Sequence, residues 1–230
     1  MRFHVRSTAV IATLATLAAL LGASPAAAQT LLTSNTITGT TLGFSSLTPN
    51  TSYPSVSLPG LTIEPISDVE LYAIGGYGLG DNGLWTSGAS LGAGGIGTAD
   101  GFGAFLRFTF DTPVNAVGGL VNYCIDALFT CNGFSATLRA YDADFNVLAA
   151  FDVDQLAPIT TPGATNAGAF RGIVVRTPSI KYLDWGGSYV VMGDVTFGAA
   201  TVAPEPASLA LVGTGLLGLA ALARRRRPNG

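Results

Sequence analysis

The middle of the chain contains many short stretches in which apolar and polar residues alternate. In AFLRFTF, residues 104–110, every second side chain is Leu or Phe, and Arg107 and Thr109 lie between them. Alternation with a period of two is typical of a strand with one buried face, and no long window carries apolar residues at helical spacing. We therefore expect an all-β domain. Other stretches with strand character are 61–66, 69–74, 114–123, 134–141, 147–154, 170–177, 179–185 and 188–197.

Clusters of Pro, Gly, Asp and Asn separate these stretches and predict turns. Asp111-Thr112-Pro113 and DADFN at 142–146 are two such clusters, and the glycines within 114–123 indicate a β-bulge. The glycine-rich residues 75–103 predict one long loop. Many short strands joined by turns favour an antiparallel β-sandwich, jelly-roll-like, over residues 29–202.

Residues 1–28 have the three-part plan of a secretory signal peptide. Arg2 and Arg6 precede an apolar stretch, which is followed by the small residues 26–28. Such residues form a signal-peptidase site, so we expect a signal helix in the precursor and cleavage between Ala28 and Gln29. A transmembrane helix is the alternative, but the apolar stretch is short for one. The pattern indicates export.

Residues 203–230 combine the triplet Pro204-Glu205-Pro206 with an apolar stretch and a basic cluster. The apolar stretch, 207–223, has 17 residues. A helix of this length reaches about 25 Å, the short limit for a bilayer core of about 30 Å. Basic residues after such a helix stay in the cytoplasm and stop transfer of the chain. The expected stop-transfer cluster consists of Arg224, Arg225, Arg226 and Arg227.

This tail resembles the PEP-CTERM sorting signal, in which the triplet, a transmembrane helix and terminal arginines occur in the same order. The resemblance covers the last 28 residues, with Ala203 where the family commonly has valine. It implies cleavage near the triplet by an exosortase, a membrane-embedded cysteine transpeptidase or protease. It also implies transient residence in the inner membrane of a Gram-negative bacterium, then delivery to the cell surface or to a biofilm matrix rich in exopolysaccharide.

The middle of the chain resembles, more loosely, domains that often precede this signal. The segments that carry the resemblance are 106–118, AYDADFNVLA at 140–149 and DVTFG at 194–198. It implies a jelly-roll, lectin-like or galactose-binding-like sandwich. Related final strands often have two adjacent aspartates, whereas Gly193 precedes Asp194 here.

The charge of the middle region argues against nucleic acid as a partner. Residues 29–203 contain five basic and 13 acidic residues, for a formal net charge of −8. An acidic domain repels phosphate backbones, so we expect no binding to DNA or RNA.

Few residues of the middle region are suited to catalysis. The single histidine, His4, lies in the leader, so the domain has no Ser-His-Asp or Cys-His triad. Glycoside hydrolysis requires only two carboxylates and stays open as an alternative. Cys124 and Cys131 are exported and even in number, which predicts a disulfide between them. We expect no enzymatic activity and no cofactor.

Two sets of residues are candidates for binding. Asp142, Asp144 and Asn146 alternate like the start of an EF-hand loop, but Val147 replaces its glycine, so a hairpin turn is the simpler interpretation and a structural calcium the alternative. Sugars would require exposed aromatic rings. The candidate rings are Trp85, Tyr77 and Trp185.

Together these features predict an exported, non-enzymatic protein of the cell surface or extracellular matrix. Its expected partners are signal peptidase, an exosortase and extracellular polysaccharide. Two alternatives stay open. One is an acid-catalysed glycan hydrolase on the same sandwich. The other is a permanently anchored single-pass membrane protein whose domain faces the periplasm.

Overall fold

The computed structural model describes residues 29–66, 70–74, 77–85, 90–94, 104–125, 135–162, 165–166, 168–187, 189–200 and Leu216. Nearly all regular structure in this part of the chain is strand. The helix α2 (Val153–Leu156) is one turn long and follows β13, with the Asp152 side chain as its N-cap. The fold is therefore all-β, as the alternating pattern predicted.

An eight-stranded sheet forms one layer of the domain. Its order is β1-β15-β11-β17-β9-β6-β3, with β2 also paired to β17, and all its pairs are antiparallel. The strands are β1 (Thr30–Leu32), β2 (Thr38–Gly43), β3 (Thr51–Tyr53), β6 (Glu70–Ile74), β9 (Ser90–Gly94), β11 (Ala116–Asn122), β15 (Ala169–Val174) and β17 (Val190–Ala199).

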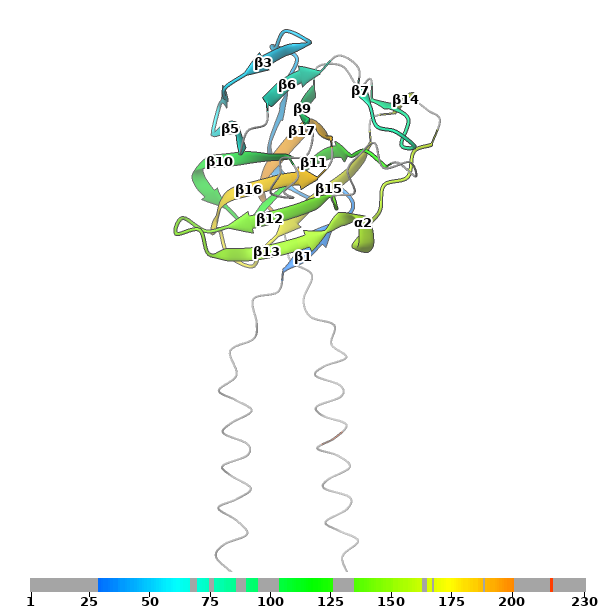
Figure 1. The fold of residues 1–230 in the computed structure, drawn as a ribbon. Coiled ribbons are helices and arrows are strands. Elements are labelled where there is room, and N and C mark those ends of the chain that lie inside the picture. The colour runs from blue at the N-terminus through cyan, green and yellow to red at the C-terminus, as the bar shows by residue number, and fades with distance from the viewer. Residues whose placement is uncertain are drawn as a thin grey trace, which may run out of the picture.

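A six-stranded antiparallel sheet forms the second layer, in the order β13-β12-β16-β10-β5-β4 (Figure 1). Its strands are β4 (Val56–Leu58), β5 (Leu61–Ile66), β10 (Ala104–Val114), β12 (Thr137–Tyr141), β13 (Val147–Asp152) and β16 (Ile180–Gly187). A small third sheet contains β7 (Tyr77–Gly78), β8 (Leu84–Trp85) and β14 (Thr165–Asn166).

The core lies between the two large sheets. Leu106, Phe108 and Phe110 of β10 are fully buried, whereas Arg107 and Thr109 between them are partly exposed. The ring of Phe110 contacts that of Phe197 on β17 at 5.2 Å between centroids, which joins the layers. Burial of each such side chain contributes about 1.5–3 kcal/mol. The structure confirms the predicted antiparallel β-sandwich.

Two local predictions from the sequence are wrong and one is confirmed. Residues 75–103 are not one loop, because β7, β8 and β9 lie within them. Asp111-Thr112-Pro113 does not turn the chain. Instead β10 continues to Val114, and its register with β16 shifts between Thr109 and Val114. The predicted bulge in 114–123 is confirmed, since β11 changes register against β17 between Gly119 and Val121.

The predicted signal helix (1–28), the helix at 207–223 and the basic cluster 224–227 lie outside the described residues, apart from Leu216. Among the helices that the structure describes, none combines the length and the apolar character needed to cross a membrane.

Candidate functional site

A row of charged residues crosses four strands on the outer face of the six-stranded sheet. Glu64 of β5 pairs in register with Arg107 of β10, Arg107 pairs with Asp184 of β16, and Asp184 pairs with Arg139 of β12. Side chains alternate between the faces of a strand, so directly paired residues share a face. The signs along the row alternate, and its sum is zero.

The centre of this charged row is a bidentate ion pair. Nε and Nη2 of Arg107 donate to the two carboxylate oxygens of Asp184, each at 2.8 Å. The Asp184 side chain is only 5% exposed and that of Arg107 is 21% exposed. The hydrogen bonds to Asp184 raise the pKa of Arg107 above its ordinary value, so the guanidinium keeps its charge. The pair fixes the position of the Arg107 guanidinium beside Asp184.

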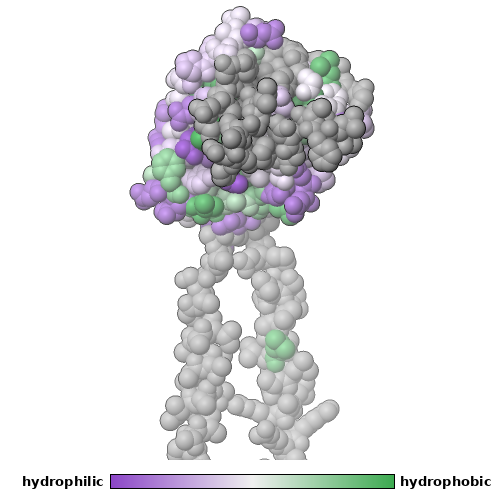
Figure 2. All heavy atoms as spheres, viewed as in Figure 1, coloured by the Kyte–Doolittle hydropathy of each residue, from purple (hydrophilic) through white to green (hydrophobic). Residues whose placement is uncertain are grey.

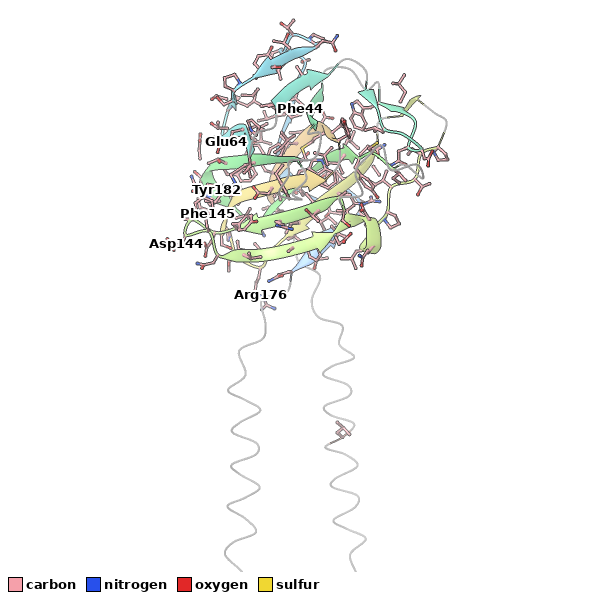
Figure 3. The ribbon with its side chains drawn as sticks, viewed as in Figure 1. Phe44, Glu64, Asp144, Phe145, Arg176 and Tyr182 are labelled. Atoms are coloured by element: carbon pink, nitrogen blue, oxygen red, sulfur yellow. The ribbon has the colours of Figure 1, made fainter. Side chains whose placement is uncertain are left out.

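An aromatic cluster lies beside the charged row, two residues further along the strands on the same face. Tyr141 of β12 pairs with Tyr182 of β16, and the ring of Phe145 stacks on Tyr182 with a centroid distance of 4.2 Å and an interplanar angle of 8°. The guanidinium carbon of Arg107 lies 5.0 Å, 5.6 Å and 5.9 Å from the ring centroids of Phe145, Tyr182 and Tyr141. Figure 3 shows Phe145, Tyr182 and Glu64 along one flank of the domain.

The turn between β12 and β13 holds Phe145 in place. Oδ1 of Asp142 accepts hydrogen bonds from the backbone N–H groups of Asp144 and Asn146, and Oδ2 accepts one from the Asn146 side chain, all at 2.9 Å. These bonds, that to the Asn146 side chain first, lower the pKa of Asp142. Phe145 has φ 61°, a left-handed conformation that non-glycine residues rarely adopt, and its side chain is 51% exposed.

A second aromatic ring lies on the other side of the charged row. Phe105 pairs with Gly186, and a Cβ at Gly186 would overlap the Phe105 ring, so the ring occupies the space above the glycine. The Arg139 guanidinium carbon lies 5.4 Å from the centroid of this ring. We call the surface formed by Glu64, Phe105, Arg107, Arg139, Tyr141, Phe145, Tyr182 and Asp184 the aromatic–charged face.

The structure contradicts two of the three aromatic rings that the sequence predicted to be exposed. Trp85 and Trp185 are fully buried, so neither ring is a surface platform. Trp85 packs with Leu79 and Val191, and Trp185 packs edge-on against Tyr123 at 6.4 Å. The side chain of Tyr77 lies outside the described residues.

The predicted calcium ligands belong to the turn beneath Phe145. Asp142, Asp144 and Asn146 do come together, but the Asp142 oxygens accept hydrogen bonds from the turn itself. Within the described part of the chain, no group of three or more His, Cys, Asp or Glu residues is placed to hold a metal ion. The hairpin turn accounts for these residues, and a structural calcium stays a prediction.

The remaining predicted sites lie largely outside the described residues. Cys124 is disulfide-bonded, whereas Cys131 is not described, so their pairing stays a prediction. The signal cleavage site between Ala28 and Gln29 is described only from Gln29 onward, and the triplet 204–206 is not described.

Comparison with known families identifies the tail. Residues 202–227 match the PEP-CTERM protein-sorting motif, which includes the triplet, the apolar stretch and the basic cluster. The chain therefore carries this sorting signal, which implies export and processing by an exosortase-type enzyme, with a surface or extracellular destination. No curated protein matches the chain. No solved structure matches it either.

Proposed function

We propose that this chain, whose tail is a PEP-CTERM sorting signal, is a non-enzymatic surface or matrix protein whose sandwich binds extracellular polysaccharide. The observation that carries the proposal is the motif at 202–227, directly after the last strand, β17, which ends at Ala199. Because the motif belongs to the same chain, the domain is sorted together with it. The envelope or the extracellular matrix is then the place where the domain works.

The arrangement of the strands supports delivery by the tail. Thr30 of β1 pairs with Val174, Val174 pairs with Ala116, and Ala116 pairs with Gly198 near the end of β17. The first and last strands thus reach the same row of the eight-stranded sheet (Figure 1). The two ends of the described domain, Thr30 and Gly198, are therefore three strand spacings apart in this sheet.

The aromatic–charged face supports binding over hydrolysis. Its two carboxylates are Glu64 and Asp184, and both oxygens of Asp184 accept hydrogen bonds from Arg107. A glycosidase needs one carboxyl group that donates a proton and a second that acts as a base or nucleophile. Both oxygens of Asp184 are held by Arg107 and its side chain is 5% exposed, so Asp184 is not placed to act on a glycosidic bond.

The first test is mass spectrometry of the C-terminus of the protein isolated from the cells that make it. We expect a chain that ends near Pro204 to Ala207, without the four arginines. In a Glu205→Ala variant we expect a larger fraction of uncut chain. A wild-type protein that still ends at Gly230 would overturn sorting and support the permanent anchor.

A binding assay then separates the matrix protein from the hydrolase. We expect the processed protein to retain polysaccharide without releasing new reducing ends. Release of sugar that stops with a single Asp→Asn substitution would favour the hydrolase instead.

A further inference from the structure

We propose that the aromatic–charged face is a binding platform for a neutral polysaccharide chain, with the exposed ring of Phe145 as its stacking surface. The inference rests on the proposed function, because it assigns the polysaccharide binding of the domain to one set of residues. Nothing in the sorting motif specifies such a site.

The position of Phe145 is costly for a residue with only a structural role. A non-glycine residue in the left-handed region costs about 1–3 kcal/mol, and such residues cluster where function requires them. Half of the residue remains exposed, so its partial burial and its stacking on Tyr182 offset only part of this cost. Asn or Gly would adopt the same backbone more easily. The turn therefore holds an aromatic ring at the surface where the local backbone favours a different residue.

The ring of Phe145 is held in place by its neighbours. It lies parallel to Tyr182, and the guanidinium carbon of Arg107 lies 5.0 Å and 5.6 Å from the centroids of the two rings, so the position of one ring is fixed by the others. A pyranose has one face of C–H groups that packs on an aromatic ring, and a rim of hydroxyl groups that form hydrogen bonds. A rigid ring binds such a face with little loss of side-chain entropy.

The charged row supplies partners for hydroxyl groups. Exposed Arg139 and Glu64 lie at its two ends and provide donors and an acceptor, respectively. The central Asp184 is satisfied by Arg107, so the groups free to meet a ligand are those at the two ends. Three strand spacings of about 4.8 Å separate these ends. A hydroxyl both donates and accepts, and a polyhydroxylated chain can therefore meet the donors of Arg139 and the acceptor of Glu64.

The charges also favour a neutral ligand over an acidic one. The row itself sums to zero, and the domain around it has a formal net charge of −8 over residues 29–203. A polyanion approaching this domain meets net repulsion, whereas a neutral polymer does not. On the coloured surface visible in Figure 2, small hydrophobic patches lie between hydrophilic ones.

The test compares binding of two fractions of the extracellular polysaccharide made by the same cells. Anion exchange separates a neutral fraction from an acidic one, and processed protein from those cells is titrated with each. We expect the wild type to bind the neutral fraction. Phe145→Asn should weaken that binding about tenfold, which corresponds to about 1.4 kcal/mol. Asn tolerates the left-handed backbone, so the midpoint of thermal unfolding should stay close to that of wild type.

Two further variants complete the design. Glu64→Gln removes a charge but not the shape of an exposed side chain, and should weaken binding about threefold by loss of a charged acceptor. Leu156→Asn is the matched control, because Leu156 of α2 is 62% exposed and lies outside the platform. Its affinity should stay within about twofold of wild type, since it removes an exposed apolar side chain without touching the site.

Each outcome bears on the inference. If wild type binds the neutral fraction and Phe145→Asn and Glu64→Gln bind equally well, the platform is wrong while the proposed function stands. If wild type binds neither fraction, polysaccharide binding fails together with the platform. Binding of the acidic fraction alone would overturn the neutral ligand.

Discussion

At the scale of single residues, Tyr123 links stability to alkaline pH. It is 3% exposed, and its hydroxyl oxygen accepts a hydrogen bond from the Ile159 N–H at 3.1 Å. Burial raises the pKa of Tyr123 to about 12, from about 10 in the unfolded chain. The folded state thus holds the proton more tightly. This contribution is complete below pH 10 and is lost as the pH rises towards 12.

Tyr123→Phe tests this linkage. Near pH 7 the variant should be less stable by about 1–2 kcal/mol, because the Ile159 N–H loses its acceptor. Only wild type carries the Tyr123 hydroxyl, so it alone loses this contribution at alkaline pH, and the stability difference between the proteins should narrow as the pH rises from 10 towards 12. Urea unfolding at several pH values measures both. Parallel loss of stability in the two proteins would contradict the assignment.

At the scale of elements, the two glycines of β11 allow the strands on either side of it to approach closely. A Cβ at Gly119 would overlap the backbone carbonyl oxygen of Asp194 on β17, at the position where the register shifts. Neither backbone is a flexible group that can move aside. Gly119→Ala should therefore lower the free energy of unfolding by about 1–3 kcal/mol.

Gly78→Ala is the control for this prediction. A Cβ at Gly78 meets no atom within 4 Å, so the change should stay within about 0.5 kcal/mol. Urea unfolding of both variants measures the comparison. Equal stability of the two variants would show that β11 and β17 separate at little cost.

The alternating pattern predicted the strands that have one buried face. In 104–110, for example, Leu106, Phe108 and Phe110 are buried as expected. The pattern failed where glycines take the place of alternating apolar and polar side chains. The strand β9, with the sequence SLGAG, was therefore predicted to be part of a loop. It also failed at Asp111–Pro113, because a strand can pass through turn residues when its register shifts.

The aromatic–charged face could not be read from the sequence. Glu64, Arg107, Arg139 and Asp184 are far apart in the chain and meet only through the strand order β12-β16-β10-β5. The local signal was present in part, since alternation put Arg107 on the outer side of its strand. Local context equally misled the choice of Trp85 and Trp185, because a tryptophan beside glycines can still lie in the core.

At the scale of the whole molecule, the tail determines where the domain goes. The positive-inside rule predicts that Arg224, Arg225, Arg226 and Arg227 hold the end of the chain in the cytoplasm while the triplet is cut outside. Replacement of all four by Gln removes that hold. Export by the leader should continue, whereas the fraction of chain cut near the triplet should fall severalfold, because charged arginines resist entry into the bilayer and glutamine resists it less.

Intact-mass analysis of the membrane and extracellular fractions measures this outcome. Arg176→Gln is the matched control, since Arg176 is an exposed arginine of the domain and its loss leaves the tail unchanged (Figure 3). Its processing should equal that of wild type. If the variant with all four arginines replaced by Gln is cut as efficiently as wild type, retention by the arginines is not required. The triplet and the apolar stretch are then sufficient for recognition. If its uncut chain appears outside the cell, the arginines act as the stop that keeps the triplet at the membrane long enough to be cut.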